Sequence, residues 1–318
     1  MHGDSSDPRP LAIDKGTITL TVFLLLLCLV AVVGNGLIIA ALSVQWLLRR
    51  MLSPCDKLLV SLGVSRFCLQ WVVITKTIYI FLHPQAFPYN PVWQCLSFQW
   101  DFLNAVTLWL SAWLSIYYCV KIATFTQPVF LWLKRKVSGL VLWMLLSSVG
   151  FSSFSAVLFL IGNHQVYQNY LKRNPQIWNV TGDAVRRSYE RFYFLPLKLV
   201  TWTVPVMVFL VGMGLLLSSL GRHTWKTIPF ILGGDNLSTQ SHVKALLALG
   251  SFAVLFVSYF LSLLLSAAGI FPSEELRYWV WQAVIYLCAA IHPIVLLLSS
   301  PRLRAVLRKV HFSRRWPS

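Results

Sequence analysis

Seven stretches of this chain are apolar over enough residues to cross a lipid bilayer, and this feature restricts the fold most. A helix rises about 1.5 Å per residue, so about 20 apolar residues span roughly 30 Å of hydrocarbon. Inside that layer each backbone N–H and C=O needs a partner within its own segment, so these runs must be helices. The chain therefore predicts an all-α fold, a bundle of seven transmembrane helices. The runs lie near residues 17–44, 58–82, 93–120, 137–162, 195–219, 245–270 and 278–299.

The overall composition agrees with lipid as the solvent. Hydrophobic residues make up 57% of the 318 residues and charged residues only 12%, whereas a soluble domain has about 25% charged residues. No internal repeat or low-complexity tract divides the chain. Residues 1–318 are therefore expected to form one seven-transmembrane domain.

Basic residues are distributed unequally between the two sets of loops. If the N-terminus is outside, the cytoplasmic loops and tail contain 16 lysines and arginines, and the outer segments contain 8. The positive-inside rule then predicts an outside N-terminus and a cytoplasmic C-terminus, as in a multi-pass protein of the plasma membrane. The net charge of +17 mainly reflects this topology and attraction to anionic membrane lipids. It does not indicate nucleic-acid binding, which would need a soluble basic surface.

The polar residues within the helices do not favour catalysis. Asp101 is the one acidic residue inside an apolar run, and the seven histidines lie mostly in loops or alone. An enzyme would need clustered His, Asp or Glu for metal or acid–base chemistry, so no catalytic residue, metal site or cofactor is predicted. A secondary transporter usually has paired repeats and interrupted helices in both halves, and the sequence has neither.

Seven helices with an outside N-terminus suit a G-protein-coupled receptor, yet the rhodopsin-like motifs are missing. The third helix ends in Tyr117-Tyr118-Cys119 instead of an acidic-Arg-Tyr triplet, and no Asn precedes His292-Pro293 in the usual position. Other motifs resemble those of the type 2 taste receptors, the bitter receptor family, along nearly the whole chain. They are Ser65-Arg66, Leu114-Ser115, Lys121 to Ala123, Phe125, Phe130 to Lys134, Ser219-Leu220, His223, His242, Lys244 to Leu246, Tyr259 to Leu263, His292-Pro293 and Arg302 to Arg304.

The resemblance implies that the chain senses small molecules. Receptors of this family bind small, often apolar bitter compounds from outside and activate a heterotrimeric G protein such as gustducin, upstream of phospholipase C and calcium release. Another seven-helix chemosensory receptor, or a membrane transporter, is the alternative interpretation.

The third helix carries the main candidates for ligand binding. Trp100, Asn104, Leu108 and Ser111 are three or four residues apart and so share one helix face. The resemblance implies that Trp100 and Asn104 line the ligand pocket, where Trp offers a broad apolar surface and Asn an amide for hydrogen bonding. In the alternative interpretation, Trp100 packs at the membrane interface and Asn104 bonds a neighbouring helix.

Asp101 lies beside that face, in the outer third of the same helix. An ionised carboxylate facing lipid costs roughly 2.5–3.5 kcal/mol, so Asp101 should face the bundle or the outer water. There it would either attract cationic ligands or form a salt bridge with Lys76 or an outer-loop arginine. Tyr259 and Gln282, in the outer halves of the sixth and seventh helices, are further pocket candidates, although each could simply join two helices.

Another group of residues is predicted to act in switching and coupling. Asn35 and Arg66 lie in the inner halves of the first two helices, too far from the outside for ligand contact, so a switch network or a structural role is expected for them. Lys121 ends the third helix on the cytoplasmic side, and His242 and Lys244 begin the sixth. These three would contact the G protein or, alternatively, lipid headgroups.

Two further features lie outside the seven runs. Asn179-Val180-Thr181 is a glycosylation sequon in the long second outer loop, where a glycan could be added. After the seventh run, Leu303, Val306 and Leu307 share one helix face and basic residues take the other. This pattern predicts a short amphipathic helix over about 301–311 on the inner leaflet.

Overall fold

Within the described residues, seven helices are long and apolar enough to cross a membrane, which confirms the predicted bundle. The computed structural model describes residues 15–49, 51–83, 89–123, 127–172, 185–227, 237–268 and 276–299. Its elements are α1 (Lys15–Arg49), α2 (Pro54–Leu82), α3 (Pro91–Ile122), α4 (Pro128–Lys172), the π-helical turn η1 (Glu190–Phe194), α6 (Leu195–Thr227), α7 (Leu237–Ala267) and α8 (Leu276–Ser299).

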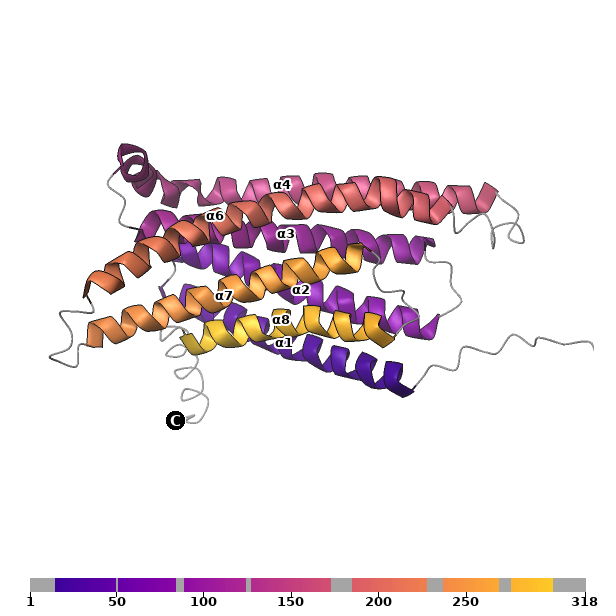
Figure 1. Cartoon of the computed structure of the whole chain (residues 1–318), viewed down its shortest axis with the longest axis horizontal. Helices are drawn as coiled ribbons and strands as arrows, with labels where there is room; N and C mark the ends of the chain where they lie inside the picture. Colours follow the sequence, from indigo (N-terminus) through magenta and orange to yellow (C-terminus); the bar gives the residue numbers. More distant parts are fainter. Residues whose placement is uncertain are drawn as a thin grey trace, which may run out of the picture.

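The helices lie side by side along the long axis of the molecule (Figure 1). Contacts between α1 and α2, α2 and α3, α3 and α6, α6 and α7, α7 and α8, and α8 and α1 close a ring, and α4 packs mainly against α3. In the most apolar stretch of α3, 67% of the residues are buried, whereas the corresponding share is 33% in α1 and in α4. The third helix is therefore the central one, and its side chains are best placed to meet those of several neighbours.

The outward faces of the bundle are apolar. On α4, Trp143 and Phe154 are 69% and 68% exposed, and many leucines and valines of the other helices are exposed as well. Such faces would be unfavourable in water but suit contact with lipid. The end of the bundle where α1 begins is called the N-side below, and the opposite end, where α8 finishes, the C-side.

Helix ends extend beyond the apolar runs that predicted them. The apolar run at 137–162 marks only the middle of α4, which continues at both ends over Pro128–Lys172. Similarly, α2 begins at Pro54 instead of residue 58 because Ser53 caps it, its Oγ accepting a hydrogen bond from the Asp56 N–H at 3.1 Å. The Asp56 carboxylate accepts from the Ser53 N–H in return, a capping box that satisfies two otherwise unpaired donors.

The fifth span changes its helical geometry near its N-side end. This span runs from Val185 to Arg222 and contains η1, after which the Leu195 N–H bonds the Glu190 carbonyl. Pro196 follows directly and has no N–H to donate, so the wider π turn lies where the regular hydrogen-bond ladder is interrupted in any case.

Two glycines allow neighbouring helices to approach closely. A Cβ added at Gly34 of α1 would lie 2.9 Å from the Pro293 Cγ of α8. At Gly212 of α6 it would lie 2.6 Å from the Ser115 Oγ and 3.1 Å from the Ile116 backbone nitrogen of α3. Small residues at such crossings are typical of membrane helix packing, where close backbone approach replaces the hydrophobic driving force.

Candidate ligand site and switch region

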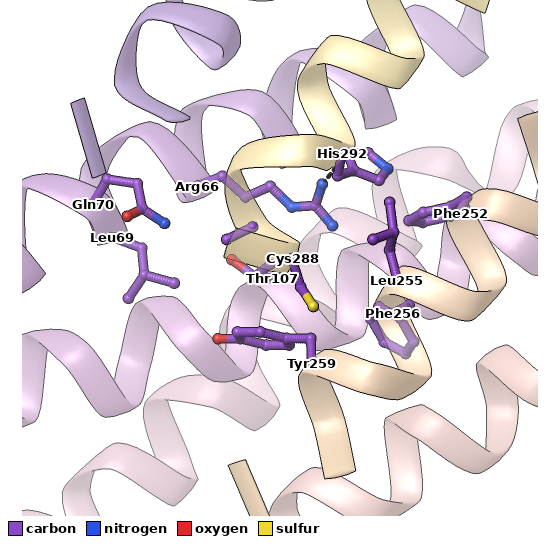
Figure 2. A pocket seen from close by; sticks show the side chains of 11 residues that line it. Arg66, Leu69, Gln70, Thr107, Phe252, Leu255, Phe256, Tyr259, Cys288 and His292 are labelled. Carbon is purple, nitrogen blue, oxygen red and sulfur yellow. Dashed lines mark hydrogen bonds between the residues drawn. The ribbon is translucent and has the colours of Figure 1, made fainter. Parts of the chain in front are cut away.

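A cavity of about 30 Å³ lies between α2, α3, α7 and α8 (Figure 2). It has room for about two water molecules, since one needs roughly 10–15 Å³. Its wall is mostly apolar on the α7 side and polar on the α2 side, where the buried Gln70 Oε1 accepts no hydrogen bond from any described residue. The lining residues are Arg66, Leu69, Gln70, Thr107, Phe252, Leu255, Phe256, Tyr259, Cys288, Ala289 and His292.

Arg66 joins three helices in the wall of this cavity. Its guanidinium contacts the His292 Nδ1 of α8 (Figure 2). It also donates from Nη2 to the Ser111 Oγ of α3 at 3.4 Å. The His292 ring lies 4.5 Å from the ring of Phe252 on α7. No carboxylate of the described residues pairs with Arg66, so neutral groups alone meet its charge. A partly buried cation without an opposite charge is expensive and is typical of a functional position within a membrane protein.

A second polar contact links the cavity to the predicted ligand face of α3. Tyr259 of α7 lines the cavity, and its hydroxyl donates to the Asn104 Oδ1 of α3 at 2.6 Å. Asn104 is fully buried, and its Nδ2 has no hydrogen-bond partner among the residues that the structure describes. The Oδ1 of Asn104 therefore joins α3 to α7, whereas the two N–H donors of its Nδ2 remain available in the interior of the bundle.

Three charged side chains gather nearer the N-side. Lys76 of α2, Asp101 of α3 and Lys198 of α6 all interact electrostatically with one another. Asp101 is only 7% exposed. Within the described residues, neither its carboxylate nor the Lys198 ammonium takes part in a hydrogen bond or an ion pair of ordinary length, and the Lys76 Nζ reaches only the Ser97 Oγ, at 3.5 Å.

Tryptophan rings surround these charges. The Lys76 Nζ lies 4.3 Å from the ring centroid of Trp93 and 5.4 Å from that of Trp100. The Lys198 Nζ lies 5.9 Å from the ring of Trp202, which meets Trp100 edge to face at 6.1 Å. Cation–π attraction stabilises an ammonium group at such distances, by about 0.5–2 kcal/mol.

Comparison with known proteins assigns this arrangement to a family. The family model for the taste receptor protein (TAS2R) matches residues 13–315. The chain is 63% identical to human (Homo sapiens) "Taste receptor type 2 member 60" over 99% of both chains. It is 56% identical to "Taste receptor type 2 member 135" of Rattus norvegicus over 93% of this chain and 92% of the other. The chain belongs to the taste receptor family.

Membership of this family, with the seven spans, makes the chain a bitter-taste G-protein-coupled receptor and a multi-pass protein of the plasma membrane. Receptors of this family are not enzymes, and they couple ligand binding to a G protein. The alternatives of a different chemosensory class or a transporter are therefore set aside.

The structure brings some of the predicted ligand residues of this taste receptor together and separates others. Asn104 and Tyr259 bond each other, and Trp100 packs near the N-side charges. Leu108 is fully buried in an apolar cluster with Phe209 and Phe256, so it supports the wall from behind. The amide of Gln282 donates to the Ser266 Oγ at 3.1 Å, which joins α8 to α7.

The structure adds detail on two of the charged residues. Arg66, which was expected to lie too deep for ligand contact, lines the same cavity as Tyr259 and bonds Ser111. Asp101 faces the bundle as expected, but it lies between two lysines and makes no ion pair with Lys76 among the described residues.

The remaining predicted switch and coupling residues show a mixed picture. The Asn35 amide of α1 is buried and donates to the Ala31 carbonyl of its own helix at 2.8 Å. The Lys121 Nζ reaches the Lys134 carbonyl at the start of α4, at 3.5 Å. His242 and Lys244 lie in the first turns of α7, but their side chains, like Asn179 and the tail helix over 301–311, lie outside what the structure describes.

His292 is a residue whose contact the sequence did not reveal. His292 was interpreted as one of the lone histidines, whereas it contacts Arg66. The sequence did contain a usable signal for this contact. Arg66 and His292 each lie 16 positions from the N-side end of their own helix, which is Leu82 for α2 and Leu276 for α8. A charged residue in an apolar span needs a partner at its own depth.

Proposed function

We propose that this receptor binds small bitter compounds from the extracellular side, with its N-terminus outside, and activates a gustducin-type G protein. Calcium release through phospholipase C would follow. The excess of basic residues in the loops on the C-side supports this orientation. The relatives' names, which are those of taste receptors, support the class of ligand.

The observation that carries the proposal is the half-used amide of Asn104. Its Oδ1 accepts from Tyr259, whereas the donors on Nδ2 are buried and find no partner in the described part of the chain. A buried polar group left unpaired costs roughly 1–3 kcal/mol. A ligand carbonyl or hydroxyl that accepts a hydrogen bond from Nδ2 would recover this energy, so the site is prepared for an acceptor.

The apolar part of a ligand would find tryptophan surfaces near this amide. Trp100 lies one helical turn from Asn104 on the same face of α3 and is only partly buried, so part of its ring remains available. A single polar contact within aromatic walls is the usual composition of a small-molecule site. Trp100 and Asn104 are therefore proposed as ligand contacts, with Asp101, Leu108, Ser111, Tyr259 and Gln282 around them.

Binding at this amide has a short route to the switch region. Tyr259 touches Asn104 and also lines the cavity in which Arg66 joins α2, α3 and α8. A ligand that accepts a hydrogen bond from Asn104 would shift this amide and with it Tyr259, and the shape of the cavity would change. Lys121, His242 and Lys244 on the C-side are proposed to meet the G protein, with Asn35 supporting α1 beside the switch.

The test uses cells that express this chain together with a gustducin-type α subunit. An epitope added at the N-terminus, detected on intact cells, measures the surface level and checks the proposed orientation. A panel of bitter compounds should release calcium, and Trp100→Ala and Asn104→Ala should each raise the half-maximal agonist concentration roughly tenfold at equal surface level.

Trp143→Ala is the matched control, because that ring is 69% exposed on the outward face of α4. It should leave the dose–response curve unchanged. Unaltered curves for both α3 variants would remove this helix from the binding site. Absence of any calcium response in cells with normal surface expression would contradict the proposed signalling function itself.

A further inference from the structure

The cluster of charges near the N-side contains more positive than negative charge. Lys76 and Lys198 bring two ammonium groups to one carboxylate, that of Asp101. The next charges around Lys198 are Glu190, which acts on it electrostatically, and Arg186, which pairs with Glu190 at 3.6 Å. That second pair is neutral as a whole. One positive charge of the described residues is therefore left without an opposite charge.

The hydrogen-bonding capacity of the cluster is also largely unused. An ammonium group carries three donors, yet the described contacts of the two lysines comprise one hydrogen bond, to Ser97, and several tryptophan rings. The Asp101 carboxylate, whose charge attracts both lysines, lies too far from either for an ion pair of ordinary length. Charged groups held near each other but not in contact can accept another charged group between them.

Aromatic surfaces define what else such a group would carry. Trp93, Trp100 and Trp202 line the two ammonium groups at 4.3–5.9 Å. A planar ring attached to an anion would pack against these indoles while its anionic oxygens reach the lysines. A cationic ligand, in contrast, would bring a third positive charge to a cluster that already has an excess.

We propose that the receptor recognises aromatic anions, carboxylates or sulfonates, through Lys76 and Lys198, with Asp101 as the internal competitor that the ligand displaces. This inference rests on the proposed function, because it takes the N-side as the ligand side. It also gives the two kinds of charged residue opposite effects. Loss of a lysine weakens anion binding, whereas loss of Asp101 frees both lysines and strengthens it.

Matched pairs of compounds test the charge preference. The probes are 2-naphthoate and 2-naphthalenesulfonate against 2-naphthamide, and indole-3-acetate against indole-3-acetamide, all measured by calcium release in the cells described above. At least one anion should activate the receptor about tenfold more potently than its amide. Lys76→Gln and Lys198→Gln should raise the half-maximal concentration of that anion about tenfold, and Asp101→Asn should lower it.

Lys172→Gln is the control for general attraction of anions, because this lysine is exposed at the N-side end of α4, outside the cluster. It should leave anion potency unchanged. If the single lysine variants do not reach the surface, Lys76→Gln/Asp101→Asn replaces them, because the double variant keeps the net charge. Its half-maximal concentration for the anion should be higher than that of Asp101→Asn alone, because only Lys198 remains to bind the anion, and equal potency of the two variants overturns the inference.

The other outcomes separate this inference from the proposed function. Silence toward every anion of the panel overturns the inference, and a response to neutral bitter compounds in the same cells keeps the proposed function intact. The inference is also overturned if the lysine variants lose as much potency for the amide as for the anion, since the lysines would then only support the fold. If Asp101→Asn raises the potency of the anion but not that of the amide, the effect does not come from a structural role of Asp101.

Discussion

Among the described residues, two partly buried basic sites occur in this bundle, and they differ in which groups surround their charges. Near the N-side, Lys76 and Lys198 lie beside an opposite charge, that of Asp101, but contact mainly indole rings. Further along α2, Arg66 has no carboxylate among the described residues, yet it contacts His292 and Ser111 directly. The lysine site has charge without fixed contacts, and the arginine site has fixed contacts without opposite charge.

The difference matches the chemistry of the two side chains. A guanidinium presents its donors in a rigid planar fork, which suits simultaneous contacts with two helices. An ammonium on a flexible four-carbon chain rotates freely and exchanges partners at low cost. The lysine site is therefore suited to a ligand that comes and goes, and the arginine site to an internal connection that has two arrangements. We expect variants of the first to change potency and variants of the second to change efficacy.

Arg66→Met should have the largest effect and would test this division directly. It removes the contact between α2, α3 and α8 and leaves a shorter, unbranched apolar side chain in its place. Replacing an isolated buried cation by an apolar group need not destabilise the fold, so the receptor should reach the surface. The maximal calcium response should fall about tenfold, with little change in the half-maximal concentration.

The control for Arg66→Met is Lys76→Gln measured with the same agonist. It should shift potency and keep the maximal response. If Arg66→Met shifts only potency, or if Lys76→Gln lowers only the maximum, the two sites do not have separate roles and the comparison fails.

The crossing of α3 and α6 concerns the lysine site, because these two helices carry Asp101 and Lys198 near the N-side. Further toward the C-side the same helices approach closely at Gly212. A Cβ there would lie 2.6 Å from the Ser115 Oγ and 3.1 Å from the Ile116 backbone nitrogen. Overpacking of this kind costs typically 1–3 kcal/mol. Gly212→Ala should therefore lower the melting temperature of the purified receptor by a few degrees.

Gly214 is a suitable control two residues along the same helix, since a Cβ there meets nothing within 4 Å. Gly214→Ala should melt at the same temperature or slightly higher, because Ala is the better helix former. Equal melting temperatures for the two variants would mean that the close contact at Gly212 does not restrain the pair of helices.

The sequence predicted the bundle well because hydropathy reports each helix separately. It placed all seven spans, but it missed the ends of α4 and the start of α2, where polar residues and the Ser53 cap continue the helix outside the apolar run. Hydropathy detects the part of a helix that lies in lipid, not the hydrogen bonds that extend it.

The candidate site was harder to predict, since its contacts join residues that are distant in the chain. The single-helix spacing that selected Asn104 also selected Leu108, yet one meets Tyr259, 155 residues away, and the other is buried in an apolar cluster. Helical periodicity shows which residues share a face but not which neighbour that face meets. The pairing of Arg66 with His292, across 226 residues, has the same origin.

The smallest expected effect concerns the one contact that connects the two regions. Tyr259→Phe keeps the ring that lines the cavity and removes only the hydroxyl that donates to Asn104. A single hydrogen bond contributes about 0.5–1.5 kcal/mol, so agonist potency should fall roughly two- to tenfold.

A double-mutant cycle with Asn104→Leu decides whether this loss of potency comes from that bond. In the Asn104→Leu background, Tyr259→Phe should have no further effect on potency, because the acceptor is already gone. If the two losses instead add in full, Tyr259 acts on the cavity independently of Asn104, and the proposed route from the ligand site to Arg66 does not pass through this contact.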